Sequence, residues 1–496
     1  MPTNLARAFI ESATRHQAKT AVFWGADEIS YDTLLRQAAG VAAHLMGPEQ
    51  IQPGDRVALW MKNCPEFVPA WFGIILAGGV VVPVNNFLKP DEIAFILRDA
   101  AVRVVIHDES LQEGAEKLAL FLPELRQLRA EEFTAAPSLS PLPGEQRSTS
   151  DLAVLVYTSG TTGHPKGAML SHGNLLANVE SCREKLVAVD HDRFVVLLPM
   201  FHSFMMTVGM LLPLLVGGSM LLIRSVSPPK NVIVEILQRR ATILPAVPQF
   251  FRALAQGGAP PDFPLRLCIS GGAPLPAEVL KEFNERMSVP LIEGYGLSET
   301  SPVVTLNPID GSGKPGSVGR PISNVEVSVQ SDDGKILGVH ETGELCVRGP
   351  NVMQGYWNQP EATAQALRAG WLLTGDLGHR DADGYFFITD RKKDMLLVNG
   401  LNVYPREIEE VIYRFPGVKE ATVIGVPDAR RGEQPVAYVS ASDGSTLDVH
   451  AIQHFVREHL ADYKVPKHIH VLPALPRNAT GKILKTELRK LANSPG

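Results

Sequence analysis

Short runs of β-branched and other apolar residues alternate with helical patterns between about residue 102 and residue 291 of this chain. The apolar runs lie at residues 102–106, 152–157, 194–198 and 219–223, and helical patterns lie at residues 232–240 and 276–287. Such alternation is typical of a parallel β-sheet with helices on its faces. We therefore predict α/β structure for this part of the chain.

The length of the chain requires more than one domain, because 496 residues exceed the roughly 250–300 at which single cores stop growing. Helical patterns become sparse at residues 315–388, which indicates a small β-rich subdomain. After the charged run at residues 390–393, a separate pattern of strands and helices begins. We predict a large N-terminal domain at residues 1–390, a small α+β C-terminal domain at residues 391–496, and an exposed hinge between them.

Charge and cysteine content exclude several classes of protein. The chain has 47 Lys and Arg against 53 Asp and Glu, a net charge of −6, without the long basic run that would neutralise a nucleic-acid backbone. Its four cysteines lie far apart, which suits neither a disulfide framework nor a zinc site. The N-terminus lacks the pattern of a secretory signal. We expect a cytoplasmic protein that does not bind nucleic acid.

Two uncharged stretches, at residues 67–84 and 194–223, reach the length at which a membrane span must be considered. Proline and glycine interrupt both of them, as expected for short buried helices joined to strands. We predict that both stretches are buried in the core.

A loop rich in glycine and hydroxyl side chains follows the predicted strand at residues 152–157. Its backbone can approach an anion closely, its hydroxyls can donate to phosphate oxygens, and its lysine supplies a positive charge. A flexible Ser/Gly turn would not require so ordered a combination, and the spacing is not that of a Walker loop. The loop predicts a polyphosphate site made by Thr158, Ser159, Gly160, Thr161, Thr162, Gly163 and Lys166.

Six further motifs follow this loop in order along the chain. They are Leu-Pro-Met-Phe-His at 198–202, Gly-Gly-Ala-Pro at 271–274, Gly-Tyr-Gly-Leu-Ser-Glu-Thr at 294–300, Thr-Gly-Asp at 374–376, Asp-Arg-Lys-Lys-Asp at 390–394 and Pro-Arg-Asn-Ala-Thr-Gly-Lys at 476–482. With them the chain resembles, nearly end to end, the acyl-adenylate-forming enzymes, and in particular the branch of acyl-CoA synthetases and fatty-acid–CoA ligases. That superfamily also includes aryl-CoA ligases, firefly luciferase and peptide-synthetase adenylation domains.

The resemblance implies a binding site for ATP. Adenine would lie between Tyr295, next to Gly296, and the turn formed by Gly272, Ala273 and Pro274. The ribose hydroxyls would bind Asp376 and Arg391, since a carboxylate can accept two hydrogen bonds at once.

The same resemblance implies that Ser298, where relatives usually have threonine, contacts the α-phosphate. Glu299 and Thr158 would then bind Mg²⁺ that bridges the phosphates.

The resemblance further implies two half-reactions in one cleft. Lys482 would bridge the carboxylate and the α-phosphate as pyrophosphate leaves, and the mobile small domain would then rotate about Lys393 to admit a thiol. Gly400 would leave room for the pantetheine arm of coenzyme A, and Asn402 would touch phosphate or ribose. For Gly400, a plain Asn-Gly turn is the alternative.

His202 would border the acyl group, where amino-acid-activating relatives usually place an aspartate near this motif. The apolar stretch at residues 201–215, which contains three methionines, favours a fatty acid as substrate. Two readings stay open: these residues only pack the core, or the enzyme is an aryl-CoA ligase. Leu397 argues slightly against a phenylpropenoid ligase, because those relatives tend to have lysine at this position.

The sequence constrains the acceptor of the acyl group and the binding partners less strongly. An acyl-carrier protein uses the same pantetheine chemistry as coenzyme A, and a non-catalytic nucleotide sensor or a luciferase-like oxygenase are further alternatives. Lys482, Glu299 and Asp376 argue against the sensor. We expect a carboxylic acid, ATP, Mg²⁺ and coenzyme A as ligands, while a homodimer and a peripheral membrane contact stay open.

Overall fold

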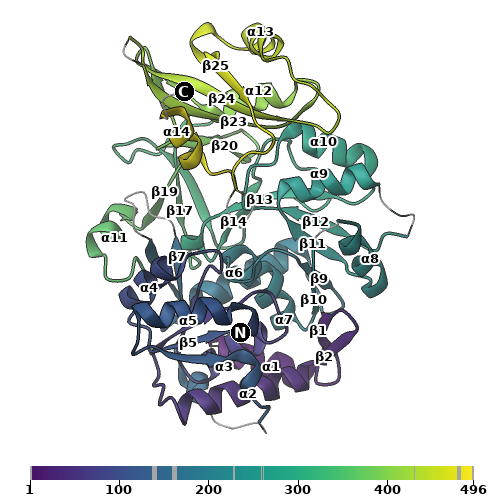
Figure 1. Cartoon of the computed structure of the whole chain (residues 1–496), viewed down its shortest axis with the longest axis vertical. Helices are drawn as coiled ribbons and strands as arrows, with labels where there is room; N and C mark the ends of the chain where they lie inside the picture. Colours follow the sequence, from purple (N-terminus) through teal and green to yellow (C-terminus); the bar gives the residue numbers. More distant parts are fainter. Residues whose placement is uncertain are drawn as a thin grey trace.

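The computed structural model describes residues 3–136, 142–158, 165–226, 229–258, 260, 262–428, 430–477 and 482–493. It contains two large sheets in the first two-thirds of the chain, a small β-rich sheet after them and a further sheet near the C-terminus. Figure 1 shows the last of these sheets at the end of the molecule opposite the helices α1 (Leu5–Arg15), α2 (Tyr31–Met46) and α3 (Phe67–Leu76).

The first large sheet has six strands in the order β6-β5-β3-β4-β7-β8. Their bounds are β3 (Arg56–Trp60), β4 (Val80–Pro83), β5 (Val104–His107), β6 (Arg126–Arg129), β7 (Leu152–Thr158) and β8 (Lys166–Ser171). All neighbours are parallel except β7 and β8, which form an antiparallel pair that leads into and out of the predicted phosphate loop.

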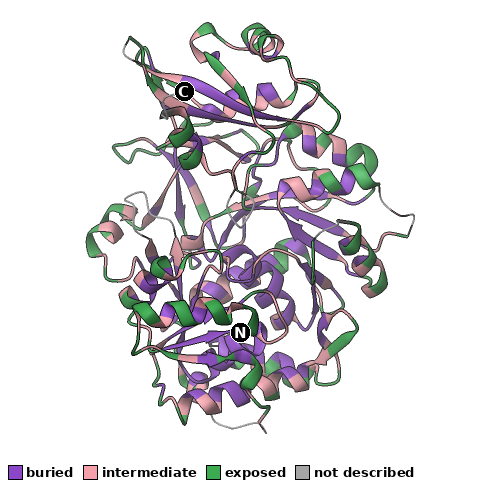
Figure 2. Cartoon of the chain, viewed as in Figure 1, coloured by how far each residue is buried: buried purple, intermediate pink, exposed green. Residues whose placement is uncertain are grey.

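Helices cover both faces of this sheet, so its central strands are buried along their whole length. The helices α2 and α3 pack on one face, and α4 (Pro90–Asp99) and α5 (Gln112–Phe121) pack on the other. Figure 2 shows these strands as buried and the outer faces of α4 and α5 as exposed.

The second large sheet has nine strands in the order β15-β14-β13-β12-β11-β9-β10-β1-β2. Their bounds are β1 (Thr20–Trp24), β2 (Asp27–Ser30), β9 (Arg193–Val196), β10 (Ser219–Leu222), β11 (Ile243–Ala246), β12 (Leu267–Ser270), β13 (Leu291–Gly296), β14 (Val303–Leu306) and β15 (Arg320–Pro321). The sheet is parallel from β1 to β13 and antiparallel at both ends. The predicted α/β architecture is therefore confirmed.

The nine-stranded sheet also has helices on both faces. On one face lie α8 (Pro229–Arg239), α9 (Pro248–Gly257) and α10 (Ala277–Arg286), and on the other lie α6 (His172–Leu186), the π-helix η4 (Met205–Leu211) and α7 (Leu212–Val216). The second face shares one hydrophobic cluster with α2 and α3, which joins the two large sheets.

The β-rich sheet has the order β16-β17-β19-β18, with β20 paired to β19. Its strands are β16 (Glu326–Gln330), β17 (Gly343–Arg348), β18 (Leu367–Arg368), β19 (Trp371–Arg380) and β20 (Phe386–Arg391), and α11 (Pro360–Ala366) precedes β18. The predicted β-rich subdomain is present at the predicted place.

The C-terminal sheet has the order β22-β21-β24-β23, with β25 paired to β24. Its elements are β21 (Leu396–Val398), β22 (Leu401–Val403), α12 (Pro405–Tyr413), β23 (Val418–Asp428), β24 (Gly432–Ala441), α13 (Val449–His459), β25 (His468–Val471) and α14 (Lys485–Asn493). These residues form hydrophobic clusters of their own. The division at residue 390 and the hinge at Lys393 stay predictions.

Both uncharged stretches lie in the interior, as predicted. Every residue of α3 is buried, and so is every residue of η4. Among the described residues, none of the helices combines the length and the apolar character that a bilayer crossing demands. The four cysteines are free thiols, and three of them are buried.

Two phenylalanines from different helices stack where α1 crosses α3. The ring centroids of Phe9 and Phe72 lie 3.8 Å apart, and both side chains are fully buried. We expect Phe72→Ala to destabilise the fold by about 3–5 kcal/mol, because it leaves a cavity under α1. Urea unfolding of the variant measures this loss. Phe121→Ala, which truncates a phenylalanine that is 44% exposed at the end of α5, is the control, and equal unfolding midpoints for the two variants would contradict the assignment.

Candidate active site

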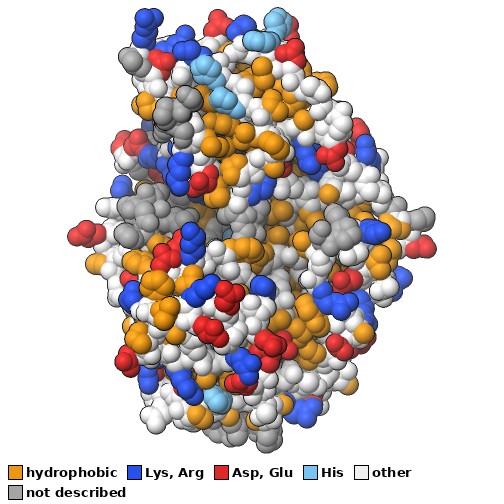
Figure 3. All heavy atoms as spheres, viewed as in Figure 1, with side chains coloured by type: hydrophobic (Ala, Val, Ile, Leu, Met, Phe, Trp, Pro, Cys, Tyr) orange, Lys and Arg blue, Asp and Glu red, His pale blue; other side chains and the backbone are white. Residues whose placement is uncertain are grey.

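A cavity of about 820 Å³ lies between the nine-stranded sheet, the β-rich sheet and the C-terminal sheet. Figure 3 shows this side of the molecule hollowed between the C-terminal part and the rest of the chain. Its lining includes the predicted site residues Gly272, Ala273, Pro274, Tyr295, Gly296, Asp376, Arg391 and Lys482. Residues from distant parts of the sequence, from Val247 to Lys485, are thus brought to one cavity.

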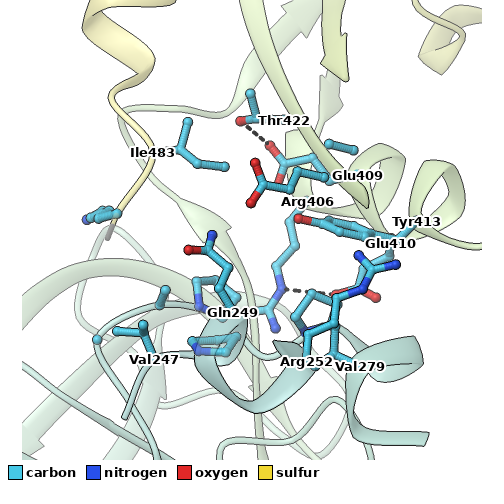
Figure 4. A pocket seen from close by; sticks show the side chains of 18 of the residues that line it. Val247, Gln249, Arg252, Val279, Arg406, Glu409, Glu410, Tyr413, Thr422 and Ile483 are labelled. Atoms are coloured by element: carbon cyan, nitrogen blue, oxygen red, sulfur yellow. Dashed lines mark hydrogen bonds and ion pairs between the residues drawn. The ribbon is translucent and has the colours of Figure 1, made fainter. Parts of the chain in front are cut away.

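The wall of the cavity that the C-terminal part forms carries several charged side chains. Figure 4 shows Arg406 of α12 extending toward Gln249 and Arg252 of α9, with Glu410 beside it, whereas Glu409 points toward Thr422. Arg252 also donates to the backbone carbonyl of Val418 at 3.2 Å, which links α9 directly to the C-terminal sheet.

The Asp376 carboxylate is the best-defined anion of the site. It is 3% exposed, accepts a hydrogen bond of 2.6 Å from the Tyr295 hydroxyl and lies 3.1 Å from Nε of Arg391. The antiparallel pairing of β19 with β20 sets Asp376 directly opposite Arg391. Burial and the neighbouring carboxylate raise the pKa of Tyr295 well above 10, so that its hydroxyl stays a donor. Each carboxylate oxygen keeps room for another donor, as ribose recognition requires.

Two glycines shape the walls of the cavity. Gly272 has a φ of +78°, and a Cβ atom there would meet only Val247, at 3.9 Å, so the backbone is bare toward the cavity. At Gly296, a Cβ atom would lie 1.9 Å from the carbonyl oxygen of Pro302. A side chain at Gly296 would therefore push apart β13 and the turn that carries Ser298 and Glu299.

Glu299 lies in the short 3₁₀ turn η5 (Ser298–Thr300), and its carboxylate is surrounded by hydroxyls. Its Oε1 accepts from the Tyr356 hydroxyl at 3.0 Å and from the Thr158 hydroxyl at 3.4 Å. Lys166, which pairs with Thr158 across β7 and β8, lies 5.3 Å from the centroid of the Tyr356 ring. Thr158, Lys166 and Glu299 therefore come together as predicted, whereas Ser159, Gly160, Thr161, Thr162 and Gly163 lie outside the described residues.

These donors fit a magnesium ion that a polyphosphate helps to hold. Mg²⁺ prefers oxygen ligands and is commonly bound by one or two carboxylates together with substrate phosphates. Glu299 and Thr158 supply such oxygens. Among the residues that the structure describes, no group of three or more His, Cys, Asp or Glu side chains could hold a metal without such help.

The segment that carries His202 contacts this turn through Ser203. The hydroxyls of Ser298 and Ser203 lie 3.0 Å apart, so the residue after His202 touches the phosphate-side turn. The Nδ1 atom of His202 accepts from the backbone N–H of Phe204 at 3.3 Å. Burial, followed by the positive charge of Lys482, lowers the pKa of His202 to about 4. The imidazole is therefore neutral near pH 7.

Lys482 reaches the same space from the C-terminal part. Its side chain is open to the solvent of the cavity, yet the surrounding walls desolvate it, and this effect together with the Arg391 charge lowers its pKa to about 8. Asp376 opposes the shift.

Eight of the predicted and described site residues do not line this cavity: Thr158, Lys166, His202, Ser298 and Glu299, whose contacts are given above, and Lys393, Gly400 and Asn402. Gly400 and Asn402 lie on the exposed hairpin of β21 and β22, and Lys393 lies exposed between β20 and β21. Asn399 and Gly400 have φ angles of +53° and +80°, as a two-residue Asn-Gly hairpin turn requires. The room for pantetheine at Gly400, the contact of Asn402 with phosphate or ribose and the rotation about Lys393 stay predictions.

Sequence reasoning missed two polar residues of the site. Tyr356 stands in Gly-Tyr-Trp, which carries no chemical signature by itself, and only the fold shows its contact with Glu299. Glu293 precedes Gly294 in β13, and its position in an otherwise apolar strand was the available signal. It lines the cavity and accepts from the backbone N–H of Leu275 at 3.0 Å, while burial raises its pKa to about 7.

The chain matches two family descriptions, "AMP-binding enzyme" over residues 9–357 and "AMP-binding enzyme C-terminal domain" over residues 407–482. It is 36% identical to a long-chain-fatty-acid–CoA ligase of Bacillus subtilis, over 96% of this chain and 92% of the relative. It is 39% identical to a feruloyl-CoA synthase of Amycolatopsis, over 95% of each chain. The solved structure of the anthranilate CoA ligase AuaEII in complex with anthranoyl-AMP has a TM-score of 0.91, with 29% identity, and covers 99% of this chain and 98% of that one.

The fold and the site thus define a nucleotide-dependent ligase of the adenylate-forming class. The chain belongs to the AMP-binding enzyme family, in its acyl-CoA synthetase branch. It is an AMP-forming acid–thiol ligase, which uses ATP and coenzyme A as substrates together with a carboxylic acid.

The low pKa of Lys482 is open to direct measurement. We expect its amine to titrate near pH 8 and to move toward its ordinary value of 10.5 in Arg391→Gln, which removes the neighbouring positive charge. The pH dependence of acylation of Lys482 by a small amine-reactive reagent, followed by peptide mass mapping, measures both. Lys335, an exposed lysine of the β-rich part, is the internal reference. An unchanged midpoint at Lys482 in the variant would show that Arg391 has no part in the shift.

Proposed function

We propose that this enzyme activates a medium- or long-chain fatty acid to acyl-AMP with release of pyrophosphate, and then transfers the acyl group to coenzyme A. The observation that carries the first step is the arrangement of Asp376, Glu299 and Lys482. Asp376 and Lys482 line the cavity, and the turn that carries Glu299 directly follows Tyr295 and Gly296 of the cavity wall. Burial and the charge of Lys482 keep His202 neutral. Attack of the carboxylate oxygen on the α-phosphorus forms the acyl-phosphate bond and breaks the bond to pyrophosphate.

Each residue has a distinct part in this step. Tyr295 and the Gly272–Pro274 turn hold adenine, Asp376 and Arg391 bind the ribose, and Ser298 donates to the α-phosphate. Glu299 and Thr158 hold Mg²⁺, which neutralises charge on the leaving pyrophosphate when it is bound. Lys482 places its ammonium against the oxygens on which charge develops, and fixed charges of this kind are strongest where water is excluded.

Small-domain rotation about Lys393 would separate the two half-reactions. Lys482 lies in the cavity while Gly400 and Asn402 lie outside it, which supports the view that this arrangement is the one used for adenylation. Rotation of the C-terminal part would withdraw Lys482 and bring the β21–β22 hairpin to the same space. Conformational steps of this kind are common where one site serves two reactions.

An uncharged acyl tail is supported by the residues next to the carboxylate position. His202 is neutral, and the side chains that follow it at residues 204–211 are apolar apart from Thr207. The methionines of this stretch, Met205, Met206 and Met210, are at most 1% exposed and belong to the shared core cluster. They therefore support an apolar surrounding but do not by themselves favour an alkyl over an aryl tail.

An aryl-CoA ligase is the second candidate, because the feruloyl-CoA synthase relative is as similar to this chain as the fatty-acid ligase is. Transfer to an acyl-carrier protein would use the same adenylate and remains an alternative for the acceptor alone. We also propose a cytoplasmic location, which the four free cysteines support.

The substrate class is tested by pyrophosphate release against carboxylic acids from acetate to palmitate, with benzoate and coumarate added, each with and without coenzyme A. We expect the highest kcat/KM with a medium- or long-chain alkyl acid, and acyl-CoA as the product. Faster turnover of the aryl acids would reject the fatty-acid proposal and leave adenylation intact. Adenylate formation without transfer to coenzyme A would favour a carrier protein.

Lys482 is expected to serve only the first half-reaction. We expect Lys482→Ala to lower the rate of pyrophosphate release by roughly 100-fold or more, as does loss of one transition-state donor, while conversion of supplied acyl-AMP and coenzyme A to acyl-CoA is retained. Since the lysine loses its charge above about pH 8, pyrophosphate release should fall above that pH and stay high just below it. Lys482→Arg, which stays charged, should lose this alkaline limb; equal losses in both half-reactions would contradict the assignment.

A further inference from the structure

The turn that carries Ser298 and Glu299 rests on two buried asparagine side chains. Asn178 of α6 is fully buried, and its amide nitrogen donates to the carbonyl of Val303 at 2.7 Å and to that of Thr300 at 3.4 Å. Its amide oxygen accepts from the backbone N–H of Val303 at 3.2 Å. The Asn178 side chain therefore bonds the backbone at Thr300 and at Val303, before and after residues 301 and 302.

Asn351 repeats this contact from the other side. It follows β17, is 1% exposed, and donates to the same carbonyls of Thr300 and Val303 at 2.9 Å and 3.1 Å. Its own amide oxygen is buried and has no hydrogen-bond partner among the described residues. A buried polar atom without a partner is unfavourable. The two hydrogen bonds that the amide nitrogen donates to the turn are therefore what favours asparagine at position 351.

The turn needs such support because its backbone is unusual. Ser301 has a φ of +71°, a conformation that residues other than glycine rarely adopt and that persists only when surrounding contacts hold it. Three further hydrogen bonds hold it here. The Ser301 hydroxyl donates to the carbonyl of Asn351 at 2.9 Å, the hydroxyl of Thr207 donates to the carbonyl of Ser301 at 2.9 Å, and the N–H of Met353 donates to the carbonyl of Glu299 at 2.8 Å.

These hydrogen bonds come from α6, from η4 and from residues 351–353, and all of them involve residues 299–303. Asn178 is fully buried and Asn351 is 1% exposed, and the side-chain amides of both bond the backbone of the turn, so both would act through the turn and not on the nucleotide. We propose that Asn178 and Asn351 are positioning residues that fix the Glu299 carboxylate for Mg²⁺·ATP, an inference that rests on the metal-binding role proposed for Glu299. Residues that orient a metal ligand through its surroundings commonly change metal affinity roughly 10–100-fold when they are removed.

The proposal separates two ligands that share most of the site. AMP uses the contacts of Tyr295 and Asp376 and, from the turn, only the Ser298 hydroxyl, and it needs no metal, whereas Mg²⁺·ATP also needs the Glu299 carboxylate. A mispositioned turn should therefore weaken binding of Mg²⁺·ATP much more than binding of AMP. A loss of general stability would weaken both equally.

The test is calorimetric binding of AMP and of α,β-methylene-ATP, each with and without Mg²⁺, to the full-length enzyme and to Asn178→Ala. We expect the Kd for the Mg²⁺·analogue to rise roughly 10–100-fold and the Kd for AMP to change far less, so that the ratio of the two constants shifts. Ser181→Ala is the matched control, because Ser181 lies on the same helix, is 2% exposed and donates to a backbone carbonyl, that of Ser323, away from the turn. It should change neither constant.

Equal weakening of AMP and of the Mg²⁺·analogue, or no change in either, would overturn the proposal. If Asn178→Ala does not fold, Thr207→Val keeps the side-chain volume, removes one hydrogen bond from the turn, and is expected to shift the same ratio in the same direction. No carboxylic acid enters the assay, so an error about the acyl substrate does not affect it. Failure of the wild-type enzyme to gain affinity from Mg²⁺ would instead reject the role of Glu299 itself.

Discussion

The Asp376 carboxylate makes polar contacts that join three parts of the chain. It lies on the β-rich sheet and accepts a hydrogen bond from Tyr295, near the end of strand β13 of the nine-stranded sheet. It also pairs with Arg391, the last residue of β20, after which the C-terminal part begins. A charge that is 3% exposed is stable only with such partners. The need to satisfy this one anion therefore sets the relative position of the nucleotide-binding strands and of the segment that carries the small domain.

Much of this arrangement was predictable from local patterns. The strands β7 and β10 and the helix α10 begin and end within one residue of the predicted positions. Motif residues that share a chemical task also lie together, because Asp376 and Arg391 pair across two adjacent strands. The strand β23 extends to Asp428, beyond the apolar run at residues 421–426, because its ladder to β24 continues to that end.

The contacts that no sequence pattern indicated are the ones made by tertiary structure alone. Tyr356 reaches Glu299 across 57 positions of sequence, and Asn178 reaches Val303 across 125. A tyrosine or an asparagine has no periodicity that would distinguish a partner at that distance from a surface position. The π-helix η4 was equally unpredictable, because its sequence is as apolar as an ordinary buried helix.

The site concentrates positive charge where a polyanion must bind. Besides desolvation, the charges of Arg391 and Lys393 lower the pKa of Lys482, and besides burial, Lys482 in turn lowers the pKa of His202. Such crowding is unfavourable in the free enzyme, and phosphate groups would relieve it. Since Lys482 belongs to the C-terminal part, the nucleotide would stabilise the closed arrangement simply by neutralising this repulsion. Departure of pyrophosphate would remove most of that negative charge and favour withdrawal of the lysine, which links completion of the first half-reaction to the geometry of the second.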